Sequence, residues 1–107
     1  MTQTTLYIHY TYDHDGFDWD PAKDAANRAK HGVGFDEAAS AFEDARGMII
    51  ADPDHSASED RFVLLGFSGR GRLRVVVHCW RKRDALIRII SARCAHSSEA
   101  RQYIRRR

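Results

Sequence analysis

The sequence predicts an α+β domain in which helices come first and strands follow. Small and apolar side chains recur at helical spacing before residue 47, and alternating apolar side chains begin after it. The connections between the predicted strands are short, which favours an antiparallel meander. With 107 residues, the chain is long enough for one core and too short for two.

The first helix is predicted from signals at both of its ends. A short strand at residues 17–20 leads into a helix over Pro21–His31, because Asp20 is a good N-cap and Pro21 suits the first helical position. Gly32 is placed to end this helix in the left-handed conformation. Four alanines form a small-residue face that we expect to lie close to another element: Ala22, Ala25, Ala26 and Ala29.

A second, shorter helix is expected at about residues 36–42, with Asp36 as its cap. Four strands follow, at Met48–Ala51, Arg61–Phe67, residues 72–80 and residues 86–93, joined by a loop at 52–60 and turns at 68–71 and 81–84. The last predicted element is a helix at about 97–104. Arginines surround its apolar side, at Arg101, Arg105, Arg106 and Arg107.

The domain is expected to span residues 17–107, preceded by an N-terminal extension of residues 1–16. Within this extension, residues 6–12 are predicted to form an edge strand or a tail that becomes ordered on contact with a neighbour. The chain contains no apolar run of eighteen residues and no signal-peptide pattern, so we expect no membrane span and a cytoplasmic location.

Charge is distributed unevenly along the chain. Residues 1–60 carry 4 basic and 13 acidic side chains, whereas residues 61–107 carry 13 basic and 2 acidic side chains. The basic half fits a phosphate-bearing partner, although a solvated basic face is the alternative. The acidic half suits a basic protein partner, a self-associating surface or solvated surface.

No metal or other cofactor is expected. The loop at 52–60 is rich in possible ligands, but their spacing matches neither a calcium loop nor a zinc site: Asp52, Asp54, His55, Glu59 and Asp60. Cys79 and Cys94 lie in separate predicted strand segments and form no ligand motif. We interpret them as buried, reduced thiols rather than as a disulfide.

The strand at 72–80 carries the residues that suggest a function. Strand alternation puts Leu73, Val75, Val77 and Cys79 on a core face, and it puts Arg72, Arg74, Val76, His78 and Trp80 on an exposed face. The exposed face would offer phosphate clamps, a group that titrates near neutral pH and a stacking surface, which suits RNA. The alternative is a solvated face with Trp80 partly covered by the last helix.

The next strand adds Arg88 on one face and Ser91 with Arg93 on the other, so one of the two arginines should share the face of His78. We therefore expect Arg72, His78, Arg88 and Arg93 to converge on one shallow basic surface. Pairing of Arg88 or Arg93 with a carboxylate from the N-terminal half is the competing interpretation.

Three long stretches resemble the BrnT family of type II toxins: "FDWDPAKDAANRAKHGVGFDEAASAF", "DPDHSASEDRFVLLGFSGRGRLRVVVH" and "IRIISARCAHSSEARQY". The resemblance implies a RelE-like fold and a ribonuclease that arrests translation. It also implies a BrnA-like ribbon-helix-helix antitoxin that represses the operon as part of the complex. The family often has a second arginine and a threonine where this chain has Cys94 and His96.

The resemblance and the strand pattern together give a set of candidate site residues. The catalytic candidates are Arg72, His78, Arg88 and Arg93, and the RNA-binding candidates are Lys30, His31, Arg61, Arg70, Arg74, Trp80, Ser91 and Tyr103. Arginines stay protonated and can only hold phosphate, so His78 is the candidate for proton transfer, with Tyr103 or Lys30 as substitutes. Structural alternatives are a dipole-neutralising role for the end of the first helix and core packing for Tyr103.

Partners follow from the same resemblance. We expect RNA as the substrate and a BrnA-like antitoxin as the protein partner, in a homodimeric toxin or a heterotetrameric complex. Operator DNA should be contacted only through the antitoxin, since no helix-turn-helix or ribbon motif is visible in this chain. The alternative function is a non-catalytic RNA-binding module, or an inactive homologue that serves as antitoxin partner and co-repressor.

Overall fold

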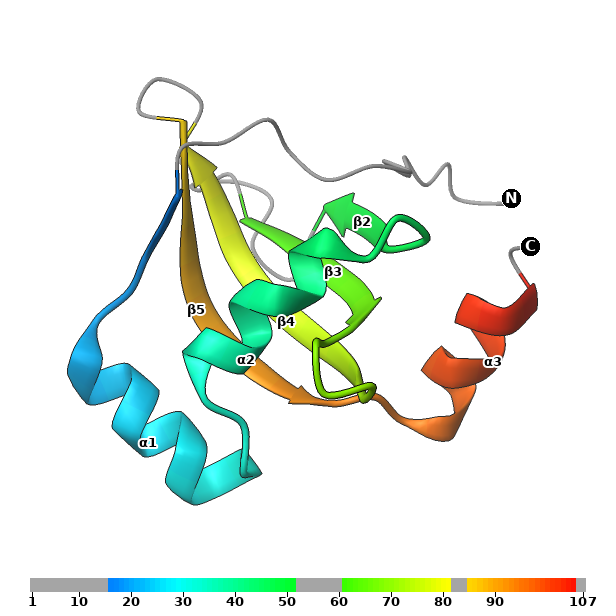
Figure 1. Cartoon of the computed structure of the whole chain (residues 1–107), viewed down its shortest axis with the longest axis horizontal. Coiled ribbons are helices and arrows are strands. Elements are labelled where there is room, and N and C mark those ends of the chain that lie inside the picture. Colours follow the sequence, from blue (N-terminus) through cyan, green and yellow to red (C-terminus); the bar gives the residue numbers. More distant parts are fainter. Residues whose placement is uncertain (1–15, 52–60, 82–84, 106–107) are drawn as a thin grey trace.

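A computed structural model of the chain describes residues 16–51, 61–81 and 85–105, and within these residues the fold is α+β, as predicted (Figure 1). In chain order the elements are β1 (Gly16–Asp18), α1 (Pro21–His31), α2 (Phe35–Ser40), a 3₁₀ turn η1 (Ala41–Glu43), β2 (Met48–Ala51), β3 (Arg61–Phe67), β4 (Leu73–Arg81), β5 (Leu86–Cys94) and α3 (Ser97–Arg105). The predictions for residues 1–15, the loop at 52–60, most of the turn at 81–84 and the last two arginines lie outside the described residues.

The sheet is mixed rather than a pure antiparallel meander. Its strand order is β1-β5-β4-β3-β2, and β2 to β5 pair antiparallel in sequence order. The difference from the prediction is β1, which pairs parallel with β5, with Phe17 opposite Ile87. The aromatic ring of Phe17 packs 5.4 Å from that of Phe42, which buries the apolar residue of this short strand against the core.

Helix α1 begins and ends where its capping residues predict. The Asp20 carboxylate accepts a hydrogen bond from the backbone N–H of Ala22 at 2.8 Å, and Pro21 occupies the first turn. Gly32 ends the helix with φ of 71°, and its N–H donates to the carbonyl of Arg28. Local signals therefore determine both ends of this helix.

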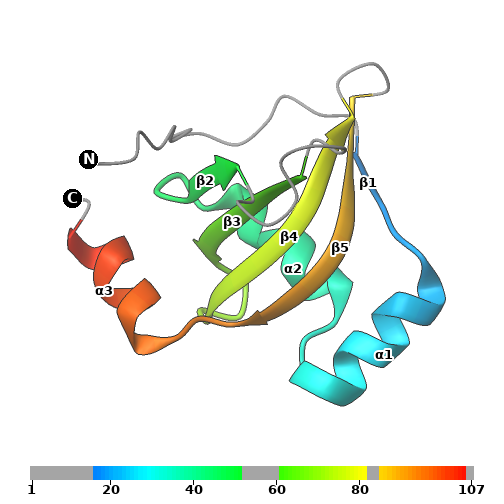
Figure 2. The same cartoon turned by 180° about the vertical axis from the view of Figure 1, so that it is seen from behind.

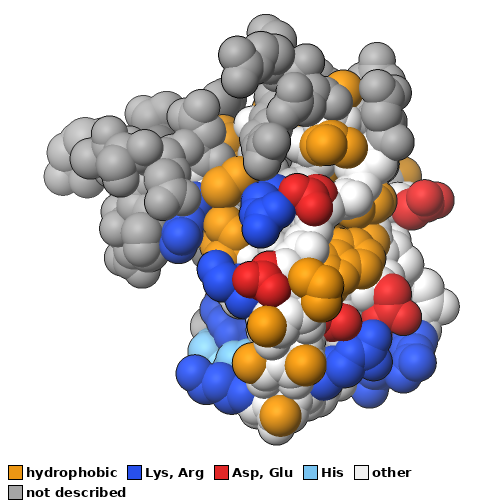
Figure 3. Space-filling model, turned by 90° about the vertical axis from the view of Figure 1, so that its left-hand side faces the viewer, with side chains coloured by type: hydrophobic (Ala, Val, Ile, Leu, Met, Phe, Trp, Pro, Cys, Tyr) orange, Lys and Arg blue, Asp and Glu red, His pale blue; other side chains and the backbone are white. Residues whose placement is uncertain are grey.

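The alanine face of α1 was expected to pack closely, and this expectation is wrong. The four alanines are exposed, and Figure 3 shows apolar side chains at the surface along α1 with Lys and Arg side chains on either side. The buried residue of α1 is Asn27, whose amide donates to the carbonyls of Val33 and Ala92, each at 2.8 Å, and accepts from the Ala92 N–H at 3.1 Å. Alanine offers little apolar area, so a buried amide attaches the helix to β5 instead.

Helix α2 begins earlier than predicted. Its N-cap is Gly34, and Asp36 lies in the first turn, where its carboxylate accepts from the N–H of Glu37 at 2.8 Å. An acidic residue in the first turn is favourable because of the helix dipole, which explains why Asp36 resembles a cap in the sequence. The helix tightens into η1 before β2.

The sheet has a buried core on each face. The larger core lies between the sheet and α2 and includes Phe35, Phe42, Val76 and Ile89. On the opposite face a smaller group of Met48, Leu65 and Val75 packs with Tyr103 of α3. Seen from behind in Figure 2, no described helix lies across the middle of this second face, because α3 occupies one end of it. No helix of the described part is long and apolar enough to span a membrane.

Candidate functional site

A β-bulge in β5 determines which arginines share a face. Val77 of β4 lies opposite Ser91, whereas the next residue, His78, lies opposite Ile89, so Ile90 is left without a partner in the register. Strict alternation would separate Arg88 from Arg93, which are an odd number of residues apart. Because of the extra residue, both arginines lie on the same face of the sheet. The prediction that they lie on opposite faces is therefore wrong.

The face that carries these two arginines can be followed across the register. Arg88 lies opposite Cys79, Ser91 opposite Val77 and Arg93 opposite Val75, and these β4 partners alternate along one face. Arg61 of β3 also lies opposite Cys79. We call the surface formed by Arg61, Arg88, Ser91 and Arg93 the arginine face. It lies on the side of the sheet that bears α3.

Arg61 and Arg88 are close neighbours on the arginine face. They flank Cys79 on either side, so two inter-strand spacings separate them, or about 10 Å between their Cα atoms. Both are partly exposed, as are Ser91 and Arg93. The long guanidinium side chains of this face can therefore converge on one anionic chain that crosses the sheet.

Arg88 and Arg93 of this face each form an ion pair with a carboxylate. Arg88 pairs with Asp18 of β1, with side-chain exposures of 37% and 40%. Arg93 donates two hydrogen bonds to Glu99 of α3, at 2.9 and 2.8 Å. The pairing interpretation is thus confirmed for Arg88 with an N-terminal carboxylate, while the partner of Arg93 comes from the C-terminal half. Such partly exposed pairs contribute about 1 kcal/mol or less, so a phosphate can replace the carboxylates.

The Arg93–Glu99 pair also changes the proton affinity of both groups. The hydrogen bond to Glu99 raises the pKa of Arg93, although burial opposes this effect. The hydrogen bonds from Arg93 lower the pKa of Glu99, against a smaller opposing effect of burial. Glu99 is therefore a weak base as long as Arg93 holds it.

The face of β4 expected to be exposed is instead covered by α2, and this prediction is wrong. His78 is fully buried and Arg74 is 3% exposed. The His78 ring lies 4.7 Å from the ring of Phe42, between Phe42 and Phe62. The alternation itself was correct, but the apolar side chain of Val76 between these residues belongs to the larger core.

The four catalytic candidates therefore do not converge. Arg72 and His78 lie on the α2 side of the sheet, and Arg88 and Arg93 lie on the α3 side. Burial lowers the pKa of His78 to about 4, despite the opposing effect of its hydrogen bond to the Val76 carbonyl. At neutral pH the imidazole is neutral and enclosed, so its position gives no support to a role in proton transfer.

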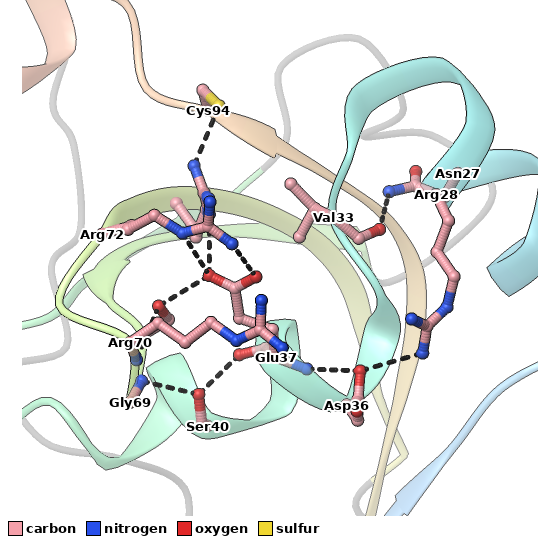
Figure 4. A network of polar contacts seen from close by, with 12 residues as sticks. Asn27, Arg28, Val33, Asp36, Glu37, Ser40, Gly69, Arg70, Arg72 and Cys94 are labelled. Atoms are coloured by element: carbon pink, nitrogen blue, oxygen red, sulfur yellow. Dashed lines mark hydrogen bonds and ion pairs between the residues drawn. The ribbon is translucent and has the colours of Figure 1, made fainter.

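Arg72 and Arg74 form ion pairs with Glu37, a buried carboxylate of α2 (Figure 4). Arg72 donates to it at 2.8 and 3.2 Å, Arg74 at 3.1 Å and the Ser68 hydroxyl at 2.8 Å. Burial raises the pKa of Glu37, but these hydrogen bonds together outweigh it and lower the pKa to about 2. This network attaches α2 to the start of β4, which is a structural role.

Arg74 also makes a contact that concerns the cysteine predictions. It donates to the sulfur of Cys94 at 2.8 Å. Both cysteines are free thiols, as predicted, but Cys94 is exposed and Cys79 only half-buried, so the expectation that both are buried is wrong. Cys94 is the last residue of β5 and is exposed there.

The remaining RNA-binding candidates lie in four places. Lys30 and His31 are in the last turn of α1, and Arg70 is exposed in the β3–β4 turn. Trp80 packs at the margin of the larger core. Tyr103 packs on the smaller core, and its hydroxyl donates to Asp44 at 2.6 Å, in agreement with the packing interpretation.

Sequence reasoning missed Asp18, Glu37 and Glu99 as partners of the arginines. Glu99 could have been found, since it is one of only two acidic residues after residue 60. Glu37 gave a weaker signal, as a carboxylate next to the inward-facing Ala38 of a helix. Across the residues that the structure describes, no group of three His, Cys, Asp or Glu side chains is placed to hold a metal ion.

The fold and the arginine face together define a small α+β protein with a surface suited to a polyanion. The family model described as ribonuclease toxin, BrnT, of type II toxin-antitoxin system matches residues 19–99, from before α1 into α3. The chain therefore belongs to the BrnT family of ribonuclease toxins. A search of curated proteins found no match.

Proposed function

We propose that this protein is an endoribonuclease that cleaves RNA without a metal ion and so arrests translation, and that the RNA lies on the arginine face. The observation that carries the proposal is the bulge at Ile90, which brings Arg88 and Arg93 to the same partly exposed sheet face as Arg61. Family membership supports the ribonuclease activity. The RelE-like fold and the cytoplasmic location are part of the same proposal.

The arginines of this face hold the phosphate and stabilise the negative charge that develops on it during cleavage. Their fixed charge performs the task that a metal ion performs in other nucleases. As the 2′-oxygen bonds to phosphorus, the bond from phosphorus to the 5′-oxygen breaks, and the departing 5′-oxygen takes a proton from water. The proton of the attacking 2′-hydroxyl needs an acceptor, and guanidinium groups cannot serve as one. We assign this role to Glu99, in place of the enclosed His78. When a phosphate replaces Glu99 as the ion-pair partner of Arg93, Glu99 loses the hydrogen bonds that lower its pKa. Its carboxylate then becomes a better base.

The protein partner in this proposal is a BrnA-like ribbon-helix-helix antitoxin, which contacts operator DNA on behalf of the complex. Covering the arginine face would neutralise the toxin directly. Induced expression should arrest growth, and co-expression of an adjacent ribbon-helix-helix gene should relieve the arrest. Growth arrest that this gene fails to relieve would contradict the proposed partner.

Arg88→Ala tests the proposed site. We expect it to lower cleavage of single-stranded RNA by roughly a hundredfold or more, because transition-state charge loses a stabilising cation. Arg101→Ala is the matched control, since Arg101 is an exposed arginine of α3 outside the arginine face. Cleavage should persist in the presence of EDTA. RNA binding without any cleavage by the unmodified protein would instead favour the non-catalytic alternative.

A further inference from the structure

A hollow of about 140 Å³ lies between α3 and the sheet, on the side of the arginine face. Its floor consists of aliphatic and thioether side chains from three strands: Met48, Ile50, Val63, Leu65 and Val75. Two polar residues of α3, Glu99 and Gln102, complete its lining. The hollow adjoins the arginine face directly, because Val75 lies opposite Arg93.

The size of the hollow limits what it can hold. Pockets for drug-sized ligands measure roughly 300–1,000 Å³, so this one is too small for them. An apolar cavity of about 150 Å³ accepts a single benzene ring. The hollow therefore fits one planar ring, which would lie on its aliphatic floor.

The polar side chains of the hollow also limit which ligand it can bind. The carboxylate of Glu99 is occupied by Arg93 and by the N–H of His96. Gln102 is exposed, and its side chain makes no hydrogen bond within the described part of the chain. Its amide offers one acceptor and two donor hydrogens, which is what the polar edge of a nucleobase requires.

We propose that this hollow binds one nucleobase of the RNA and that Gln102 reads the polar edge of that base. The proposal rests on the proposed function and adds a determinant of sequence preference to it. A base in the hollow would place its own phosphate beside Arg93 and next to Glu99. An apolar side chain of a protein partner would fill the floor but would use neither the Gln102 amide nor the adjacent cation, so the base is favoured.

The test compares the unmodified protein with Gln102→Ala and Gln102→Glu. Cleavage and binding are measured with short single-stranded RNAs that carry each of the four bases at one position. The unmodified protein should prefer one base, and Gln102→Ala should reduce that preference roughly tenfold. Gln102→Glu should change which base is preferred, because a carboxylate accepts hydrogen bonds and cannot donate them. Arg101→Ala should retain the original preference.

The outcomes of this test distinguish failure of the base-binding proposal from failure of the proposed ribonuclease function. Absence of cleavage by the unmodified protein would contradict the proposed function. The base preference measured in RNA binding would then by itself show whether the hollow binds a nucleobase. An unchanged base preference in both Gln102 variants would contradict the proposal that the hollow binds a base, and it would leave the ribonuclease proposal intact. Weaker antitoxin binding in these variants, with unchanged base preference, would show that a protein side chain occupies the hollow and would also overturn the proposal.

Discussion

Arg93 and Glu99 join β5 to α3 through two parallel hydrogen bonds, from Nη1 to Oε1 at 2.9 Å and from Nη2 to Oε2 at 2.8 Å. This carboxylate competes with RNA phosphate for Arg93. Glu99→Gln should therefore tighten RNA binding, because no carboxylate then competes with the phosphate for Arg93, and it should leave the slope of log affinity against log salt nearly unchanged, because the number of phosphate contacts stays the same. The same change should slow cleavage by roughly a hundredfold or more if Glu99 accepts the proton.

The matched control for this change is Glu43→Gln, which removes one negative charge from an exposed position on η1. It should leave both binding and cleavage nearly unchanged. Fluorescence anisotropy at several salt concentrations measures the binding, and single-turnover cleavage measures the chemical step. Tighter binding with undiminished cleavage would remove Glu99 from the proposed mechanism while retaining Arg93 as a phosphate ligand.

His78 should make the stability of the fold depend on pH. Its pKa is about 4 in the folded protein and about 6.5 in the unfolded chain. The unfolded chain therefore binds more protons between these values, so stability is complete above pH 6.5 and falls as the pH drops towards 4. The loss amounts to about 3 kcal/mol. Urea denaturation at a series of pH values measures it.

His78→Leu should remove this pH dependence, because leucine has no titrating group and a similar volume. Below pH 4.5 a second decline should remain, since the pKa of Glu37 is lowered to about 2 and its protonation breaks the arginine network. A folded His78→Leu variant should cleave RNA within a few-fold of the unmodified rate. A hundredfold loss in a variant that folds normally would restore the role of His78 in proton transfer.

The sequence predicted the parts of this fold that depend on local signals. Asp20, Pro21 and Gly32 define α1 because caps act within one turn of the chain. The face assignment of β4 failed because both of its faces are apolar, through Val75 on one side and Val76 on the other. The pattern alone does not indicate which of two apolar faces is the better covered.

The candidate site was less predictable because it depends on contacts between distant residues. The charge of the buried Arg74 is neutralised by Glu37, 37 positions earlier in the chain. The bulge at Ile90 exists only in relation to the register of β4, so no feature of the β5 sequence indicates it. Arg88 and Arg93 remain predicted site residues, whereas the face that they share is evident only from the structure.

Glu37→Gln should be strongly destabilising. Arg74 is 3% exposed, and loss of the carboxylate leaves its guanidinium charge buried without an ionic partner. Breaking a buried ion pair from one side costs roughly 3 to 5 kcal/mol. Chemical denaturation measures this cost, and the exposed Glu43→Gln variant again serves as the control. A cost below that of a surface substitution would show that water or another group replaces Glu37.

Salt dependence distinguishes the arginine face from the arginines of the C-terminal helix. The logarithm of the affinity for single-stranded RNA falls linearly with the logarithm of the salt concentration, with a slope of about −0.7 for each phosphate contacted. Arg88→Ala should remove the contribution of one phosphate contact from this slope and also lower cleavage by roughly a hundredfold or more, since Arg88 lies on the face where transition-state charge develops. Replacing Arg105 together with Arg106 and Arg107, the last two of which lie outside the described residues, should flatten the slope and leave cleavage largely intact. If the C-terminal arginines prove essential for cleavage and Arg88 dispensable, the active site lies on α3 rather than on the sheet.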